Sequence, residues 1–175
     1  AIQVHLESYV ELRKPTPFSK IAPVPDDLAM RTADIKGAGY FLDASQIGIC
    51  EIIDTVWLDK QRPDHSHAII IMVEYADPID QTNAAAEWIM GNEQLLATLF
   101  AAEIGIDLSG QISSMGFGSC VHWLGRTEVD LDKLAVLGGI GIRDANRLIN
   151  PYLNDRFALA AVTTNYAMQI DIPLA

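Results

Sequence analysis

Two apolar runs constrain the fold of this chain more than any other feature. Residues 67–75 are apolar almost throughout, and residues 156–164 are strongly apolar. A strand with one face in water alternates apolar and polar residues, so we expect the first run to be a central strand buried on both faces. The chain must then cover a sheet on both sides. With 175 residues, half of them apolar, it can do so within one domain.

Further patterns supply the elements that would cover such a sheet. Residues 25–27, Pro-Asp-Asp, are typical of a helix start, and the helix is expected to end near Asp43. Residues 82–106 carry apolar side chains at spacings of three, four and seven, which predicts a long amphipathic helix. We also expect helices at 108–116 and 130–137, strands at 46–53 and 119–124, and a loop at 57–66. This order predicts an α+β fold, a mixed β-sheet with flanking helices.

The first residues of the chain differ in composition from the rest. Four prolines fall within residues 1–25, which have few periodic apolar positions. We therefore expect an extended N-terminal arm with a short strand at residues 2–6, of the kind that wraps a neighbouring subunit. Residues 26–175 are expected to form a single α+β domain.

Charge and cysteine usage narrow the partners and the compartment. A formal charge of −11 argues against binding to nucleic acid or anionic lipid, which requires clustered Lys and Arg. The longest apolar run, residues 68–73, is far shorter than the roughly twenty residues that cross a bilayer. Cys50 and Cys120 lie in strand-like, apolar contexts where a reduced buried thiol is the common state. We expect a cytoplasmic protein that does not bind membranes.

A glycine-rich segment follows the helix expected at 130–137. Gly138-Gly139-Ile140-Gly141 lacks the spacing of a dinucleotide fingerprint and comes after a helix instead of before one. We expect Gly138 or Gly139 to end the helix in a left-handed conformation. Glycines also let a backbone approach a large planar ligand, so the segment is a candidate cofactor contact as well.

Three polar residues just beyond these glycines stand out in an acidic chain. Arg143 and Arg147 each have a planar guanidinium group with several N–H donors, and Asn146 has both a donor and an acceptor. Together they could bind a phosphate or the amide-rich edge of a cofactor. The alternative is a solvated loop that makes ordinary salt bridges to Asp144 or Asp155.

Residues 120–125, CVHWLG, resemble the DxHxxG signature of a cobalamin class in which His is the lower axial ligand. Cys takes the place of the orienting Asp here, so no protein His is expected on cobalt. On a strand, Cys120 and His122 point the same way, as two metal ligands would. A zinc site needs three or four ligands, and His65 and His67 come without a further cluster, so no metal site is predicted.

Tyr75 and Tyr152 are the candidate catalytic hydroxyls. A buried Tyr can donate a proton when a nearby cation lowers its pKa, although most tyrosines at strand ends only anchor a hydroxyl at the surface. An acidic run after the strand at 67–75 leaves two readings open, acid–base groups at the mouth of a site or a solvated helix entry. It comprises Asp77, Asp80, Glu87 and Glu93.

Four segments resemble, in the same order, the cobalamin-binding region shared by reductive dehalogenases and epoxyqueuosine reductases: residues 34–52, 68–75, 111–121 and 134–165. The resemblance implies a nitroreductase-like α+β fold in which base-off cobalamin is held mainly by main-chain contacts. The residues that it places at the cofactor are Gly139, Ile140, Gly141, Arg143, Asn146, Arg147 and Thr163.

The family's complete enzymes also hold two iron-sulfur clusters, and here the chain departs from the pattern. Its two cysteines cannot supply the four thiolates of one cluster. The resemblance therefore implies a corrinoid-binding domain or subunit that is not a complete enzyme alone and takes electrons from an iron-sulfur partner. It is similar to the duplicated, catalytically silent copy of the cobalamin domain found in some of these dehalogenases.

Two alternatives remain open at this stage. The same fold could bind a flavin and reduce small substrates at a dimer interface. It could also be a catalytically silent scaffold that dimerises through the N-terminal arm and the helix expected at 82–106. In all three readings a homodimer is the expected assembly.

Overall fold

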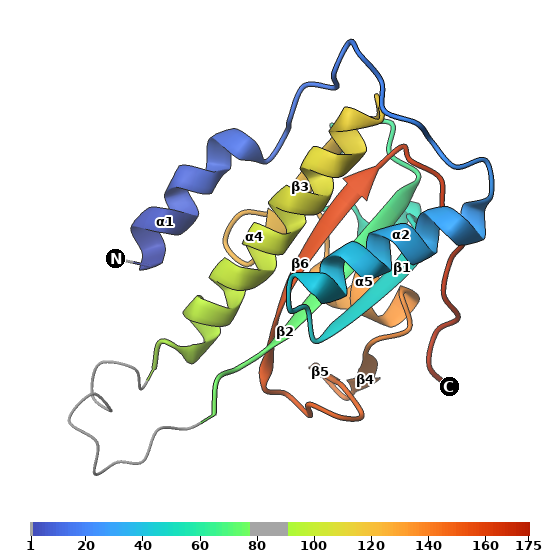
Figure 1. Ribbon diagram of the computed structural model, residues 1–175. Helices are drawn as coiled ribbons and strands as arrows, with labels where there is room; N and C mark the ends of the chain where they lie inside the picture. Colours follow the sequence, from blue (N-terminus) through green and yellow to red (C-terminus); the bar gives the residue numbers. More distant parts are fainter. Residues whose placement is uncertain (1, 78–90) are drawn as a thin grey trace.

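The computed structural model describes residues 2–77 and 91–175 and has a four-stranded sheet at its centre (Figure 1). In spatial order the strands are β1 (Gln46–Glu51), β2 (His67–Glu74), β6 (Phe157–Thr164) and β3 (Ser119–Trp123). The predicted α+β class is confirmed, but the sheet is not mixed, since all three neighbouring pairs are antiparallel. The reason is that β2 and β3 run in the same direction and are separated by β6, which runs opposite to both.

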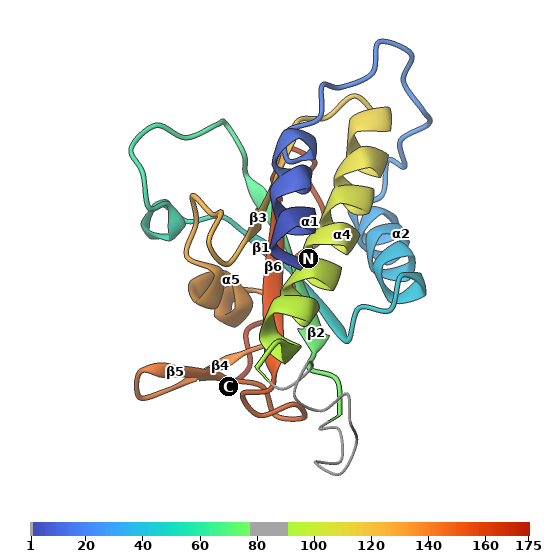
Figure 2. The same cartoon turned by 90° about the vertical axis from the view of Figure 1, so that its left-hand side faces the viewer.

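Helices cover both faces of this sheet, as the apolar runs require. In Figure 2, α1, α2 and α4 lie on one side of the strands and α5 on the other. Along β2, Ile69 and Ile71 belong to the larger hydrophobic cluster on the α4 side, whereas Ile70 and Met72 belong to the smaller one on the α5 side. The predicted central strand is thus buried on both faces. The helices are α1 (Ile2–Ser8), α2 (Leu28–Phe41), α4 (Glu93–Ser114) and α5 (Leu131–Leu137).

The longest helix merges two segments that the sequence pattern separated. α4 runs without a break from Glu93 to Ser114, and the expected helix residues 82–90 lie outside the described part of the chain. Gly105 lies within this helix. A side chain at this position would collide with Val121 of β3, so the glycine permits close packing of the helix on the sheet. α4 is long and apolar enough to cross a membrane by composition alone, and its buried stripe against the sheet explains that composition.

The N-terminal residues are helical, so the predicted strand at residues 2–6 is wrong. α1 is followed by the 3-10 turn η1 (Tyr9–Leu12), and residues 13–27 continue without helix or strand. Leu6 is buried against the larger cluster, with Tyr9 and Val10 packed beside it. Spacings of three and four residues suit a helix lying on α4, and the prolines begin only after this helical part.

The helix start predicted at residues 25–27 is confirmed, and the helix expected at 130–137 also begins at a carboxylate cap. Asp27 accepts a hydrogen bond from the amide of Ala29 (2.8 Å), and Asp130 accepts one from the amide of Lys133 (3.0 Å). After α5 the chain forms a small hairpin of β4 (Ile142–Asp144) and β5 (Arg147–Ile149).

Single residues pair with both edge strands of the sheet. At β3, the carbonyl of Arg13 accepts from the amide of Val121 (2.9 Å), and the Arg13 Nε donates to the Val121 carbonyl (2.6 Å). At β1, the amide of Asp171 donates to the Ile49 carbonyl (2.8 Å), and the Asp171 carboxylate accepts from the Ile49 amide (2.8 Å). The N-terminal segment and the C-terminal tail are thereby fixed to opposite edges.

Candidate functional site

The glycine segment after α5 ends the helix, as the sequence predicted. Gly138 is the C-cap residue, and Gly139 has a φ of +71°, in the left-handed region. The amides of Gly139, Ile140 and Gly141 donate to carbonyls within α5, those of Val136 and Ala135. These three donors are therefore already used inside the protein.

The open sides of the glycines are filled by the protein itself. A Cβ on Gly139 would lie 2.3 Å from the carbonyl oxygen of Ile172, so the C-terminal tail occupies the space next to this residue. A side chain on Gly141 would meet Leu148 of the hairpin. The carbonyl of Ile140 accepts from the buried Asn150 side chain at 2.7 Å. The segment packs internally and leaves little backbone for a ligand.

The three polar candidates after the glycines lie on the hairpin and face solvent. Arg143, Asn146 and Arg147 are all exposed, and Arg147 is 3.6 Å from Asp155, a pair that the sequence analysis had anticipated. Thr163, by contrast, is fully buried near the far end of β6, which points away from the hairpin (Figure 1). The structure therefore brings the hairpin residues together but separates Thr163 from them.

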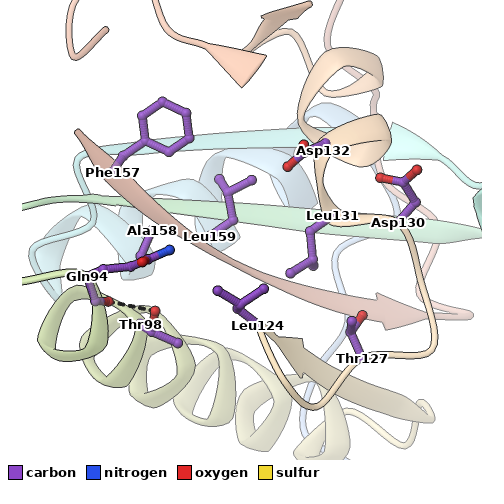
Figure 3. Close-up of a pocket in the computed structure, with 10 residues that line it drawn as sticks. All are labelled: Gln94, Thr98, Leu124, Thr127, Asp130, Leu131, Asp132, Phe157, Ala158 and Leu159. Atoms are coloured by element: carbon purple, nitrogen blue, oxygen red, sulfur yellow. Dashed lines mark hydrogen bonds between the residues drawn. The ribbon is translucent and has the colours of Figure 1, made fainter. Parts of the chain in front are cut away.

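A cavity of about 270 Å³ lies where α4, β6 and α5 begin (Figure 3). Leu131, Phe157 and Leu159 give it an apolar wall, and Asp130 and Asp132 bring carboxylates to its rim. Burial raises the pKa of Asp132, and the negative charge of Asp130 raises it further. Such a cavity suits a small, mainly apolar molecule with a hydrogen-bond donor.

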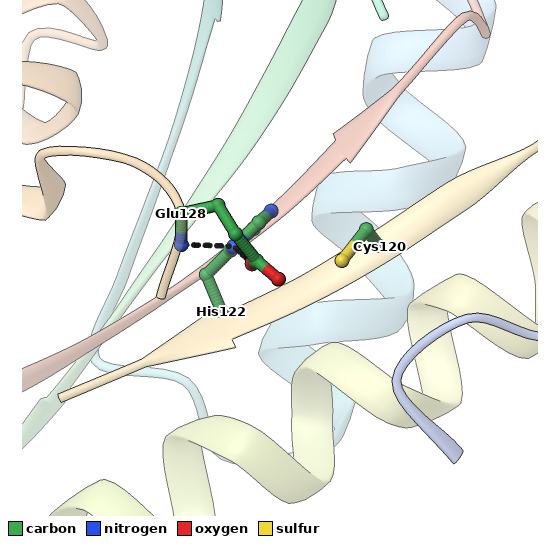
Figure 4. A group of neighbouring side chains, drawn as sticks. All are labelled: Cys120, His122 and Glu128. Carbon is green, nitrogen blue, oxygen red and sulfur yellow. Dashed lines mark hydrogen bonds and ion pairs between the residues drawn. The ribbon is translucent and has the colours of Figure 1, made fainter. Parts of the chain in front are cut away.

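A buried polar cluster lies on the α5 side of the sheet, at the β3 edge (Figure 4). Cys120 and His122 project from the same face of β3, as predicted, and Glu128 reaches them from the loop that follows the strand. His122 Nδ1 is 2.9 Å from the Glu128 carboxylate. The fourth member is Arg13, whose guanidinium donates a hydrogen bond to Glu128. Only 7% of the Arg13 side chain is exposed to solvent.

Charge in this cluster is balanced between Arg13 and Glu128. The hydrogen bond with His122, the hydrogen bond from Arg13 and the positive charge of Arg13 hold the pKa of Glu128 well below its usual range. Burial lowers the pKa of His122, so the imidazole is neutral at pH 7. A neutral ring carries one proton: on Nδ1 it donates to the Glu128 carboxylate at 2.9 Å, and on Nε2 it leaves Nδ1 to accept from the Glu128 amide at 3.3 Å.

The hydrogen-bond chain continues from His122 through the sheet. Its Nε2 is 3.0 Å from the Thr163 hydroxyl, which is in turn 2.9 Å from His65 Nδ1. His65 and Cys120 line an open cavity of about 570 Å³, together with Lys14, Arg62 and Ser119. Burial lowers the pKa of His65 to about 4. The cluster is thus buried but reachable from solvent through this cavity.

The two candidate tyrosines do not join this cluster. Tyr75 is partly buried, its pKa is raised by burial, and the Arg156 guanidinium lies 5.6 Å from its ring centroid. Tyr152 is 81% exposed in the turn after the hairpin. Of the acidic run, Asp80 and Glu87 lie outside the described residues. Within the described residues, 2–77 and 91–175, the surroundings of the two tyrosines do not favour a role at a ligand.

Sequence reasoning missed Arg13 and Glu128. The alternation of Cys120 and His122 on a strand was visible, but no local pattern links them to a residue more than a hundred positions earlier. The one available signal was a basic Arg13-Lys14 pair in a strongly acidic chain.

No family model matches the sequence, and no curated protein sequence matches it. Solved structures do. A reductive dehalogenase described with a mechanism for B12-dependent dehalogenation has a TM-score of 0.91 and 34% identity, over 99% of this chain and 25% of that chain. The catabolic reductive dehalogenase NpRdhA, in complex with 3-bromo-4-hydroxybenzoic acid, has a TM-score of 0.90 and 34% identity, over 99% of this chain and 24% of that chain.

Epoxyqueuosine reductase from Streptococcus thermophilus has the same fold at 13% identity, with a TM-score of 0.58 over 82% of this chain and 48% of that chain. The sheet with helices on both faces is therefore the α+β fold that reductive dehalogenases and epoxyqueuosine reductases share. The chain is similar to one region of these reductive dehalogenases and spans about a quarter of their length. The resemblance predicted from the sequence is confirmed.

Proposed function

We propose that this chain is a corrinoid-binding domain or subunit of a reductive dehalogenase-like oxidoreductase. The observation that carries the proposal is the similarity to a B12-dependent reductive dehalogenase, at 34% identity and a TM-score of 0.91 over almost the whole chain. Cobalamin is the cofactor that this relationship favours. Bound cobalamin would supply a redox-active cobalt centre.

The residues of this chain fit such a cofactor only at its edge. The cavities of about 270 and 570 Å³ are too small for a whole corrinoid, which exceeds the drug-sized ligands held by pockets of up to roughly 1,000 Å³. The amides of Gly139 to Gly141 are bonded within the protein. The exposed donors of Arg143, Asn146 and Arg147 remain as contacts for a ligand that lies mostly outside this chain.

Electrons for such an enzyme must come from elsewhere. Cys50 and Cys120 are both buried in the sheet and lie on opposite edge strands, β1 and β3. Three strand spacings separate them by roughly 14 Å, so they neither share a cluster nor form a disulfide without rearrangement. We propose an iron-sulfur protein or domain as the electron-transfer partner.

Hydroxocobalamin provides the test. The purified chain is mixed with it under oxidising and then reducing conditions, and gel filtration with visible spectroscopy follows the protein and the corrinoid. Co-elution is expected for the wild type. It should be lost in the double variant Arg143→Ala/Arg147→Ala and retained in Lys60→Ala, which removes an exposed cation from another loop. Absence of co-elution under both conditions contradicts corrinoid binding by this chain alone.

A second candidate function is a catalytically silent subunit, favoured by the tail that fills the space beside Gly139. In this case the fold serves as a scaffold for a partner that holds the cofactor. Native mass spectrometry separates the two candidates, because a scaffold would carry neither corrinoid nor flavin while forming a defined assembly. A homodimer and a cytoplasmic location remain predictions.

A further inference from the structure

The polar cluster beside β3 has the donor set of a metal site. Cys120 Sγ, His122 Nδ1 and a Glu128 carboxylate oxygen all lie within 4.8 Å of one another. Thiolate, imidazole and carboxylate are the three kinds of side chain that bind Zn²⁺, and three protein ligands with one open position are typical of accessible zinc sites. Because His122 Nδ1 and the Glu128 carboxylate are already 2.9 Å apart, only Cys120 Sγ would need to approach, by about 1 Å, to reach bond lengths of about 2.0–2.3 Å.

A cation already occupies the centre of this group. Arg13 Nη2 lies 3.7 Å from Cys120 Sγ and 3.5 Å from His122 Nδ1, and it hydrogen-bonds the Glu128 carboxylate. One guanidinium nitrogen therefore contacts all three prospective ligands. We propose that Cys120, His122 and Glu128 form a binding site for Zn²⁺ or a similar divalent transition metal, and that Arg13 and the metal are alternative occupants.

The surroundings of His122 support metal binding through Nδ1. Histidine ligands donate the proton of their second nitrogen to a fixed acceptor, which orients the ring. Here Nε2 is 3.0 Å from the Thr163 hydroxyl, and that hydroxyl has His65 Nδ1 as its own partner at 2.9 Å. A proton on Nε2 of His122 therefore has a hydrogen-bond acceptor in place, and no heavy atom has to move.

A route for the ion also exists. Cys120 lines the open cavity of about 570 Å³, which gives access from solvent to one ligand of the three. Lys14, the next residue after Arg13, lies at the same cavity. Movement of residues 13 and 14 would therefore open the cavity and vacate the site together.

Replacement of the Arg13 guanidinium by the metal ion involves no change of oxidation state. The metal forms bonds to Sγ, to Nδ1 and to one carboxylate oxygen, and water fills the remaining position. The thiol proton of Cys120 goes to solvent, and the neutral imidazole binds through Nδ1 with its single proton on Nε2. Arg13 keeps its charge and loses its side-chain bonds to Glu128 and to the Val121 carbonyl, and release of the N-terminal segment from the β3 edge also breaks the bond from the Val121 amide to the Arg13 carbonyl.

Co²⁺ as a spectroscopic probe of the full chain tests the site. In Arg13→Met, which removes the competing cation and keeps an apolar stem, we expect one Co²⁺ per chain with a thiolate charge-transfer band, bound about tenfold or more tightly than by the wild type. Arg62→Met removes a cation that lines the same cavity and pairs with Asp54, not with a proposed ligand, so it should leave the affinity near that of the wild type. Adding Cys120→Ala to Arg13→Met should abolish the charge-transfer band.

A second measurement uses the wild type and does not depend on the variants folding. Trypsin cleavage after Arg13 should become faster when Zn²⁺ is added, because the metal displaces this residue, and Cys120→Ser should remove the acceleration. The proposal is wrong if Zn²⁺ leaves this cleavage unchanged and Arg13→Met binds Co²⁺ no better than Arg62→Met. Binding that persists in the double variant without Cys120 overturns it as well.

Discussion

The buried guanidinium of Arg13 depends on one carboxylate for its charge balance. Only 7% of its side chain is exposed, and its partners besides Glu128 are neutral: the Val121 carbonyl, the Cys120 sulfur, the His122 ring and the Trp123 ring. Breaking a buried ion pair by removing one partner is costly because the other charge remains buried and uncompensated. Glu128 is therefore a residue on which the stability of the whole β3 edge depends.

Substitution of Glu128 by Gln should destabilise the protein. We expect a loss of about 2 kcal/mol in the free energy of unfolding, below the ~3–5 kcal/mol of fully buried pairs because Glu128 is one-third exposed. Urea denaturation measures it. The exposed pair of Arg62 and Asp54 supplies the control, since Arg62→Ala should cost less than about 1 kcal/mol. Equal losses in the two variants would contradict the assigned role of Glu128.

At the level of elements, two glycines set how closely β1 approaches the end of α5. A Cβ on Gly48 would lie 2.3 Å from the carbonyl oxygen of Gly138, and one on Gly138 would overlap Ile70. The strand and the helix end therefore touch through backbone. This close contact positions the hairpin and its exposed arginines relative to the sheet.

Gly48→Ala should consequently destabilise the fold. Forcing an extra methyl into a packed contact costs about 1–3 kcal/mol, and here the obstructing atom is backbone and cannot move aside by a rotamer change. The matched control is Gly37→Ala in α2, where no atom lies within 4 Å of the new methyl. That change should be neutral or stabilising by up to about 1 kcal/mol. Thermal unfolding of both variants tests the prediction, and similar melting temperatures would refute it.

The elements that periodicity and carboxylate caps specify locally were predictable from the sequence. α2, α5 and the four long strands fall where the pattern placed them, since each is defined by a few neighbouring residues. α1 was not predicted because its stability comes from packing Leu6 against α4, a contact far along the chain. The polar cluster shows the same limit. Cys120 and His122 follow from strand geometry, whereas Arg13 and Glu128 join them only through the tertiary fold.

At the scale of the whole molecule, two neutral histidines, the partly buried His65 and the buried His67, make the fold sensitive to acid. Burial lowers the pKa of His65 to about 4 and also lowers that of His67. Below about pH 6.5 the unfolded chain takes up protons at these positions and the folded chain does not, so stability falls as the pH falls. For His65 this loss continues until the pH reaches its folded pKa.

Urea midpoints between about pH 7 and pH 5 should therefore decrease for the wild type. The decrease should be smaller in His65→Gln, which keeps a hydrogen-bonding group toward Thr163 but cannot be protonated. His5→Gln on the exposed side of α1 serves as the control and should follow the wild type. A pH dependence that is unchanged in His65→Gln would remove His65 as a contributor.

The residues that close the two sheet edges have a consequence for self-association. Open edge strands are templates on which further chains add by strand pairing, the route to fibrils and domain swapping. Here each edge is sealed by a charged residue whose side chain is held by a partner, Arg13 by Glu128 and Asp171 by Lys36. A further copy could extend the sheet only after breaking one of these ion pairs. Neighbouring copies would accordingly meet through helices and loops. Deletion of residues 1–13 would leave the β3 edge open, and further chains could then add to the sheet and aggregate.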